Sequence, residues 1–558
     1  MSRLRLKNTY SKTIEDFLPL DPGGKVSLYS CGPTVYSFAH IGNFRSFLLG
    51  DVLRRILEQR GYAVRHVMNI TDVGHMTEDH LADATGEDKL ARAARELGWD
   101  PYMVAAHFER AFAEDAKLLR MKNYLPSEDS VAALHPRATD HVPEMLAMIQ
   151  TLIDRGHAYV DSSGQVYYSV ATFQEYGQLS GKVMEELEAG ARISVRAEKR
   201  DPRDFALWKV DAKHLMQWDP HSEQGWAKGE YARMRSLVPG GIDPAVRAGF
   251  PGWHIECSAM SRARLGPVID IHTGGEDNIF PHHECEIAQS FGARESSSAP
   301  VNFCRYWVHA RHLLVNGAKM SKRDGTFITV RDLFNPQVCK RPELAAQLVA
   351  AGFADGCVPP NILRFALIST PFTQPMNFTI DVLAQSRAAV ERLQSLYDRL
   401  APLSAAGTPS ADVAALLADA NAELDRALND NINTPRALAV VFGVVTAANQ
   451  RQTTGADAAA VRGFLERMDE IFAVLERERG PRGGTLSNVE LEAMASALPE
   501  GTQPGEGNDA DTVRRILALR FGARRRRDFA RADELRKLLV ARGVELEDQR
   551  DGIRWRCS

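Results

Sequence analysis

Residues 26–43, with the sequence VSLYSCGPTVYSFAHIGN, join a strand to a helix through a glycine-containing turn. The first four residues form a short run of apolar and aromatic side chains that predicts a strand, and Gly32-Pro33 ends it. Residues 44–57 carry apolar side chains at helical spacing. The helix therefore begins beside His40 and Asn43, where free N–H groups and the helix dipole favour an anion such as phosphate.

A second apolar run, over residues 64–70, places another strand after this helix. Strand, helix and strand in succession predict a parallel pair, and ligands of parallel sheets bind at the carboxyl ends of the strands. Cys31, His40 and Thr71 follow those ends, so we expect them to converge. A later strand over 268–272 belongs to the same core. The predicted fold class is α/β, with a Rossmann-like (HUP-type) parallel-sheet nucleotide-binding domain that contains an insertion.

The chain has 558 residues, enough for several domains. Its patterns change in order: helical over 76–120, hairpin-like over 159–170, irregular over 172–250, helical over 360–478, and Gly- and Pro-rich over 480–510. The predicted division is a first catalytic half at 1–120, an insertion at 121–248, a second catalytic half at 249–330, a connecting region at 331–385, an α-helical bundle at 386–479, a flexible linker at 480–510 and a small basic C-terminal domain at 511–558.

Composition limits the function classes. The net charge is −4, so nucleic-acid binding would depend on local patches such as Arg524–Arg527, although most charge runs of this kind are solvated helix faces. The seven cysteines are scattered and odd in number, which argues against a disulfide framework. No apolar run approaches a membrane helix, and the N-terminus lacks a signal-peptide core. We expect a cytoplasmic protein without a membrane partner.

A lysine pair lies far along the chain from the first motif. Lys319-Met320-Ser321-Lys322 follows a strand-like run at 307–315 and the turn Asn316-Gly317. Transfer of an adenylate group builds negative charge at the α-phosphate, and donors must meet that charge. Two lysines in a loop that reaches a phosphate site would supply such donors.

A second group of residues suits a metal ion. His282 and Glu286 are four apart and share one helix face, while Cys31 and Cys257 supply two thiolates. Two thiolates, an imidazole and a carboxylate match zinc in type and number. His283 and Cys285 are competing ligands, although the spacing to Glu286 favours His282. The alternative is a set of buried thiols and unrelated polar residues.

The sequence HIGN at 40–43 followed by KMSK at 319–322 resembles the paired signatures of class I aminoacyl-tRNA synthetases. Nearly the whole chain resembles the cysteinyl-tRNA synthetase family within that class. The matching strings are YSCGPTVYSFAHIGN, NITD at 69–72, GWHIECSAM at 252–260, FPHHECEIAQS at 280–290 and NGAKMSK at 316–322, with weaker matches at 433–442 and in the C-terminal tail.

This resemblance implies roles residue by residue. Cys31, Cys257, His282 and Glu286 would hold one Zn²⁺ per chain. Catalysis with ATP and Mg²⁺ would use His40, Asn43, Lys319 and Lys322. The predicted cysteine- and ATP-binding residues are Gly32, Thr34, Thr71, Trp253, His272, Asp277 and Lys322. The partners would be tRNA-Cys, L-cysteine and ATP, with 331–385 near the tRNA stem, 386–479 and the tail reading the anticodon region, and a monomeric chain.

Zinc would serve recognition here. Cysteine, serine and alanine are nearly isosteric, and an apolar pocket gains only about 1–3 kcal/mol from a methylene-sized difference. A soft metal distinguishes thiolate from hydroxyl by bond type. Two thiolates and a carboxylate outweigh the charge of the ion, which makes it a poor activator of water and suits substrate binding.

Two alternatives stay open at this stage. One is a ligase that uses the same adenylation chemistry to join cysteine to an amino sugar, and the other is a non-catalytic tRNA-binding or zinc-stabilised protein. The chain also departs from the family pattern in four places. Arg323 follows KMSK, the segment after NITD is longer, HTGGED at 272–277 leaves Thr273 and Glu276 unassigned, and residues 209–250 diverge most.

Overall fold

The computed structural model describes residues 3–78, 85–126, 131–182, 199–295, 302–320, 326–335, 341–353, 356–451, 455–477, 483–498, 502–504, 510–542, 544–549 and 552–557. These residues form two compact units. The first comprises Met1–Arg387 with Glu423–Ala439 and Glu470–Ala473, and the second comprises Ala388–Ala422, Val440–Asp469 and Val474–Ser558. Within the described ranges, no helix combines the length and apolar character needed to cross a membrane.

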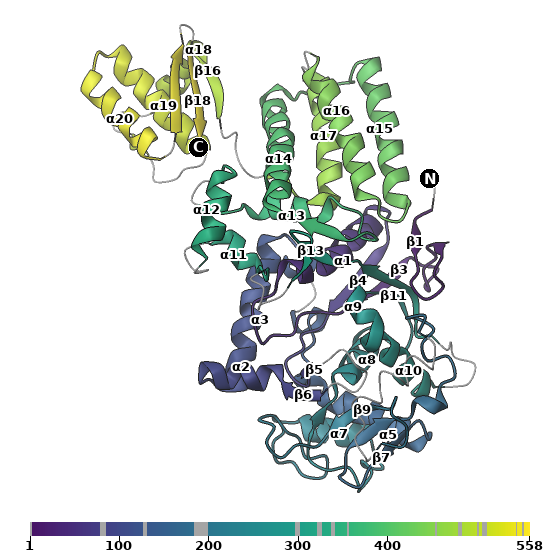
Figure 1. Ribbon diagram of the computed structural model, residues 1–558. Coiled ribbons are helices and arrows are strands. Elements are labelled where there is room, and N and C mark those ends of the chain that lie inside the picture. Colours follow the sequence, from purple (N-terminus) through teal and green to yellow (C-terminus); the bar gives the residue numbers. More distant parts are fainter. Residues whose placement is uncertain are drawn as a thin grey trace. The chain divides into compact units, whose positions relative to one another are not determined.

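A four-stranded parallel sheet forms the centre of the first unit. Its order is β12-β11-β3-β4, with bounds β3 (Lys25–Ser30), β4 (Ala63–Met68), β11 (Ile269–Gly275) and β12 (Cys304–Ala310). The predicted strands, and the parallel pairing of β3 with β4, are confirmed (Figure 1). In register, Ser30 lies beside Met68 on one side and Thr273 on the other, so the carboxyl ends of β3, β4 and β11 share one edge.

Helix α1 (Ile41–Gln59) connects β3 to β4 and contacts the sheet along its apolar face. Phe44, Leu48, Val52 and Ile56 are all fully buried, which matches the predicted helical spacing. Burying such side chains contributes about 1.5–3 kcal/mol each. This packing holds the N-terminus of α1 at the carboxyl edge of the sheet.

The insertion contains an antiparallel sheet of order β10-β9-β8-β7, with bounds β7 (Ala158–Val160), β8 (Val166–Tyr168), β9 (Phe205–Lys209) and β10 (Phe250–Pro251). The predicted hairpin at 159–170 is confirmed by the pairing of β7 with β8. The prediction of an irregular 172–250 is wrong at β9 and at α7 (Glu230–Leu237). All five residues of β9 are buried, so this strand shows no alternation of apolar and polar residues.

Residues 76–120 contain more than the predicted helices. A hairpin of β5 (Met76–Glu78) and β6 (Thr85–Asp88) precedes α2 (Lys89–Leu97) and α3 (Pro101–Leu118). The strands are short and polar, so local periodicity does not reveal them. Met76 pairs with Asp88, and this pairing brings the start of the segment next to the start of α2.

The remaining elements of the first unit surround these sheets (Figure 1). They are β1 (Arg5–Lys7), β2 (Ile14–Asp16), α4 (Val131–Leu134), α5 (Val142–Asp154), α8 (Trp253–Leu265), α9 (Glu276–Asn278), α10 (Glu284–Gly292), β13 (Leu313–Val315), β14 (Ala318–Lys319), α11 (Val330–Phe334), α12 (Pro342–Ala350), α13 (Pro360–Ile368), β15 (Met376–Phe378), and the short helical turns η1 (Lys122–Tyr124), η2 (Thr139–His141), η3 (Val170–Thr172) and η5 (Ile279–His283).

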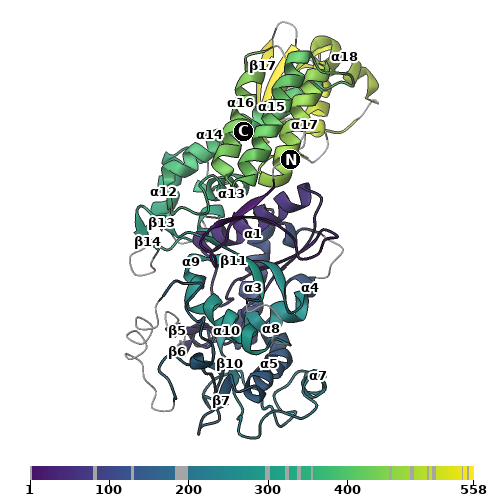
Figure 2. The same ribbon diagram turned by 90° about the vertical axis from the view of Figure 1, so that its right-hand side faces the viewer.

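The predicted helical bundle is present, and most of it belongs to the second unit (Figure 2). Its helices are α14 (Ile380–Leu400), α15 (Ala411–Asn429), α16 (Thr434–Asn449) and α17 (Gly455–Phe472), with the turn η7 (Ala401–Leu403) after α14. One apolar row from each helix is buried, represented by Leu393, Leu424, Val441 and Leu465. The amphipathic patterns in the sequence therefore mark real core faces.

The C-terminal part of the second unit corrects the linker prediction. Residues 480–510 were expected to be a flexible linker, but β16 (Gly483–Ser487) pairs with β18 (Gly552–Cys557), and α18 (Asn488–Ala497) follows it. Leu486 and Leu491 are buried in one core with residues of α19 (Ala510–Arg525), α20 (Phe529–Ala541) and β17 (Val544–Gln549). Strand pairing and two buried leucines thus place 483–497 in the C-terminal fold, although the glycines of this segment suggested a linker.

A buried charge cluster fixes α1 within the first unit. The Asp51 carboxylate accepts hydrogen bonds from Arg364 at 2.6 Å and from Arg55 at 3.0 Å, while Arg364 also donates to the Phe472 carbonyl at 2.6 Å. Burial would raise the pKa of Asp51, but the guanidinium groups of Arg55 and Arg364 outweigh it and hold the pKa below its usual range. The resulting stability is present above the ordinary aspartate pKa and is lost as the pH falls toward the folded-state value.

Replacing Arg364 by Met should therefore destabilise the first unit strongly. Removing Arg364 leaves the buried Asp51 carboxylate with Arg55 as its one remaining guanidinium partner, and breaking a buried ion pair in this way costs about 3–5 kcal/mol. Urea unfolding followed by circular dichroism would measure the change. Arg92→Met is a suitable control because Arg92 and Glu96 are exposed and 3.7 Å apart, and such pairs contribute about 0–1 kcal/mol. Equal effects of the two substitutions would contradict this account.

Candidate active site and metal centre

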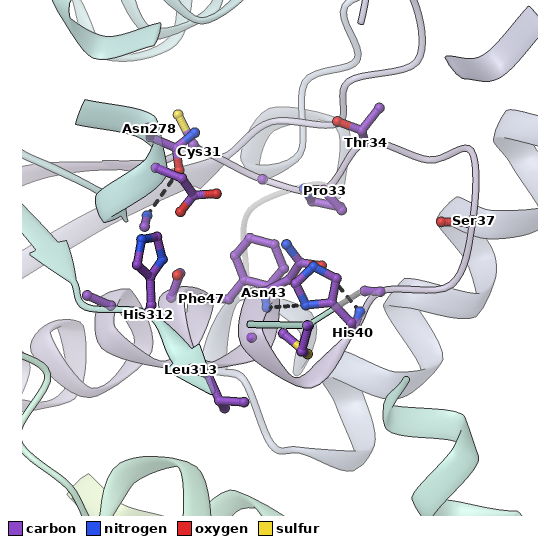
Figure 3. A pocket seen from close by; sticks show the side chains of 18 of the residues that line it. Cys31, Pro33, Thr34, Ser37, His40, Asn43, Phe47, Asn278, His312 and Leu313 are labelled. Atoms are coloured by element: carbon purple, nitrogen blue, oxygen red, sulfur yellow. Dashed lines mark hydrogen bonds between the residues drawn. The ribbon is translucent and has the colours of Figure 1, made fainter. Parts of the chain in front are cut away.

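A cavity of about 310 Å³ opens at the carboxyl edge of the parallel sheet. Many of the predicted site residues line it: Cys31, Gly32, Thr34, His40, Asn43, Trp253, Asp277 and Lys319. Figure 3 shows the loop from Cys31 to Ser37 on one side, with His40 and Asn43 at the start of α1 and His312 and Leu313 opposite. Residues more than 200 positions apart in the sequence thus share one wall, as the convergence of strand ends predicts.

The HIGN motif is a capping box at the N-terminus of α1. His40 is the N-cap, its Nδ1 accepts a hydrogen bond from Asn43 N at 3.2 Å, and Asn43 Oδ1 accepts one from His40 N at 3.2 Å. Because Nδ1 accepts, the proton of the neutral imidazole is on Nε2, which makes Nε2 a donor. The motif therefore caps the first turn of the helix and also holds a hydrogen-bond donor at a position that favours anions.

The hairpin of β13 and β14 brings the lysine motif to the same place. Lys319 is exposed at the end of β14, and a Cβ on Gly42 would lie 2.5 Å from Met320 Cε. After the loop, Ile41 N donates to Ile328 O at 3.1 Å and the ring of Phe327 meets that of His40 at 5.2 Å. Lys322 lies outside the described residues. The two motifs are thus neighbours, although about 280 residues separate them.

The metal-donor cluster adjoins the cavity through Cys31, which lines it. Cys31 Sγ is 3.9 Å from Cys257 Sγ and 3.9 Å from Glu286 Oε1, and His282 Nε2 is 3.2 Å from Glu286 Oε1. Cys31, Cys257, His282 and Glu286 each offer a ligand atom within 4.8 Å of the others. A second set, Cys31, His272, His283 and Glu286, meets the same limit. Both competing histidines are therefore within reach of the same carboxylate.

The donors' neighbours hold both histidines in place. His282 Nδ1 is 3.0 Å from His254 Nδ1, and His283 Nδ1 is 2.8 Å from His309 Nε2. Cys285, the other competing ligand, is fully buried, and its Sγ lies 3.4 Å from the Tyr176 hydroxyl. It belongs to neither donor set.

Burial dominates the electrostatics of the cluster. It raises the pKa of the Cys31 thiol well above its ordinary value, with further rises from Cys257 and Glu286, and it also raises the pKa of Cys257. Burial and the neighbouring histidines lower the pKa of His282 well below its ordinary value. A divalent cation would reverse the cost of ionising these thiols and suits a set of sulfur, nitrogen and oxygen donors.

Two predicted pocket residues are placed differently from the rest. Thr71 is buried, its hydroxyl accepts from Asn69 at 3.0 Å, and its backbone pairs with the segment at Pro33 and Val35. His272 is fully buried, stacks on Trp307 at 4.6 Å and lies 3.1 Å from Glu286 Oε2. Neither is among the described residues that line the cavity, although His272 belongs to the second donor set.

Other cavity residues were missed by the sequence analysis. Arg311 and His312 line the wall and both pair with Glu276, at 2.6 Å and 2.7 Å. His75 and Lys89, from the segment that follows NITD, line it as well. In the sequence, these four residues were distinguished only by lying near a motif. Contacts across strands and turns bring them to the cavity, and such contacts cannot be read from neighbouring residues.

Two family models and full-length relatives match this chain. A family model described as "tRNA synthetases class I (C) catalytic domain" matches residues 18–231 and 241–349, and one described as "DALR domain" matches residues 424–476. The chain is 39% identical over 560 residues to a cysteine–tRNA ligase from Salinibacter ruber, covering 99% of this chain and 98% of that protein. It is 37% identical over 562 residues to one from Chlorobaculum tepidum, covering 100% and 99%.

In fold, the chain is similar to a leucyl-tRNA synthetase from Agrobacterium radiobacter, solved as a ternary complex with tRNA and LeuAMS. The TM-score is 0.52 at 12% identity, with coverage of 82% of this chain and 84% of the other. This likeness concerns the fold alone and agrees with the predicted α/β class.

The donor cluster generates a test that does not depend on which histidine binds. Cys31 belongs to both donor sets, so Cys31→Ala should abolish most of the bound metal, whereas Cys285→Ala should leave it unchanged. Metal content per chain, measured by inductively coupled plasma mass spectrometry after purification with zinc, checks this. A Cys31→Ala protein that retains zinc at the wild-type ratio would show that the metal is bound elsewhere.

Proposed function

The chain belongs to the cysteine–tRNA ligase family of class I aminoacyl-tRNA synthetases, and from that premise we propose how its cavity joins L-cysteine to tRNA with ATP. The observation that carries the proposal is the shared cavity: the HIGN cap and the lysine hairpin line the same space as Cys31 and Trp253, beside the metal-donor cluster. Phosphate chemistry and thiol recognition therefore meet within one small volume.

The first step is adenylate formation. The cysteine carboxylate attacks the α-phosphate of ATP, a carboxyl–phosphate bond forms, and the bond to pyrophosphate breaks. His40 Nε2–H, the Asn43 amide, Lys319 and Lys322 would meet the negative charge that develops on the phosphates. Mg²⁺ bound with ATP would supply further positive charge there. Gly32, Thr34 and Asp277 line the wall where cysteine and adenosine would bind.

The second step transfers cysteine to tRNA. The terminal ribose hydroxyl attacks the carbonyl of the adenylate, an ester forms, AMP leaves, and the hydroxyl proton passes to the departing phosphate or to solvent. We assign this step to positioning and charge stabilisation, because a correctly held pair of reactants supplies much of the rate. Residues 386–479 and 511–558 would contact the tRNA, and 331–385 its stem, in a monomeric chain.

Cys31, Cys257, His282 and Glu286 would hold one Zn²⁺. When bound, zinc supplies a site that accepts the substrate thiolate and disfavours the serine hydroxyl. Thr71 and His272 act at one remove from the substrate, Thr71 through the backbone at Thr34 and His272 through Glu286. Trp253 closes the pocket around the short side chain.

The choice between the two histidines is open to a direct test. His282→Asn should lose most of the zinc and raise the KM for cysteine. His283→Asn should retain the metal, because under the proposed assignment His283 lies beside the zinc ligands and is not one of them. Zinc content and the KM for cysteine in pyrophosphate exchange are the two readouts. Loss of zinc in His283→Asn with retention in His282→Asn would reverse the assignment.

Aminoacylation tests the function itself. The purified chain, given ATP, Mg²⁺, radiolabelled cysteine and bulk tRNA, should place acid-precipitable label on tRNA and leave serine unused. Cysteine-dependent pyrophosphate exchange without tRNA charging would favour the amino-sugar ligase instead. Neither activity, in a preparation that contains zinc, would support the non-catalytic alternative.

A further inference from the structure

The indole of Trp253 stacks against two imidazole rings at the wall of the cavity. The ring of His75 stacks on it at 4.0 Å with an interplanar angle of 10°, and the ring of His282 stacks at 4.3 Å with an angle of 29°. Trp253 and His75 both line the cavity, and Trp253 is half-buried. The orientation of this indole therefore depends on a histidine that the proposed chemistry does not use.

His75 is itself held at both ring nitrogens. Its Nε2 lies 2.9 Å from Lys89 Nζ, and its Nδ1 lies 2.7 Å from Thr34 Oγ1. An ammonium group only donates, so Nε2 must accept, and the proton of the neutral ring is then on Nδ1 and is donated to Thr34. Only 9% of His75 is exposed. The ring is thus fixed in position and in tautomer.

The backbone reinforces this arrangement. His75 immediately precedes β5, Lys89 is the first residue of α2, and Lys89 N donates to His75 O at 2.9 Å. The two residues close the base of the β5–β6 hairpin with both main chain and side chains. This hairpin belongs to the segment after NITD that departs from the family pattern in length.

The hydrogen bond from His75 also limits where the hydroxyl hydrogen of Thr34 can point. Since His75 Nδ1–H donates to Thr34 Oγ1, the threonine's own O–H must point elsewhere, and Thr34 lines the cavity. Lys89 also lines the cavity, with its ammonium 5.7 Å from the centre of the Tyr36 ring. A donor hydroxyl and a cation at this wall suit an anionic group such as an amino-acid carboxylate.

We propose that His75, held by Lys89 and Thr34, is a positioning residue for cysteine recognition, which fixes the indole of Trp253 against the proposed zinc ligand His282. The inference rests on the proposed cysteine site. A small substrate gives an enzyme little binding surface, so a displaced pocket wall weakens binding noticeably. ATP, which meets the HIGN and lysine motifs, should be insensitive to this stack.

The test compares His75→Ala with His75→Phe, which retains a ring for stacking, and with Lys89→Met, which removes the donor to Nε2. Arg92→Met, an exposed change on the same helix, is the control. The readouts are the KM values for cysteine and ATP in pyrophosphate exchange, the Kd for cysteine by isothermal titration calorimetry, zinc content and melting temperature. Loss of an aromatic stack should raise the KM and Kd for cysteine about three- to tenfold in His75→Ala.

The expected pattern has four parts: an unchanged KM for ATP, unchanged zinc content, a smaller increase in the cysteine KM for Lys89→Met, and partial recovery in His75→Phe. An unchanged cysteine KM in His75→Ala, or an equal rise in the KM for ATP, would overturn the proposal. If His75→Ala does not fold, His75→Phe and Lys89→Met decide the proposal. A raised KM for cysteine with an unchanged KM for ATP supports it, and an unchanged KM for cysteine or an equal rise in both overturns it. A wild-type protein without cysteine-dependent exchange would instead reject the proposed function.

Discussion

The parallel pairing of β3 with β11 is the constraint on which the site depends. Ser30 lies opposite Thr273, and Cys31 N donates to Thr273 O at 3.1 Å, so both strands reach the same edge together. A buried hydrogen bond of 2.6 Å joins the side chains of Ser30 and Thr273. The chain leaving β3 becomes the glycine-containing turn and α1, where we propose that phosphate binds, and the chain leaving β11 leads to His282 and Glu286. One register thus brings the proposed adenylation residues and the metal-donor residues together.

Burial gives the donor cluster its chemistry. Thiols, imidazoles and a carboxylate share a largely buried space, and burial disfavours the charged form of each. Such a group of residues is costly to assemble for packing alone, because an apolar core of the same volume would avoid that cost. A bound cation would remove the penalty, and under the proposed function it would also offer the substrate thiolate a ligand position.

The sequence revealed features that are local or periodic. His40 and Asn43 could be placed at a helix start because a cap is read from neighbouring residues, and Cys31 could be placed at the sheet edge because a strand precedes it. His75, Lys89 and the Glu276–Arg311 pair could not, because strand pairing and turns bring them to the cavity. Likewise, β9 and β16 were missed: one is buried throughout and the other begins with two glycines, so neither has the expected alternation.

The most direct test of the account replaces zinc by Co²⁺ and records the visible absorption spectrum during titration with cysteine or serine. Entry of the substrate thiolate into the coordination of the metal should change the charge-transfer and d–d bands with cysteine, while serine at the same concentration leaves them unaltered. Identical spectra with both amino acids, in a protein that still forms cysteinyl-adenylate, would contradict the claim that the cluster recognises the thiol.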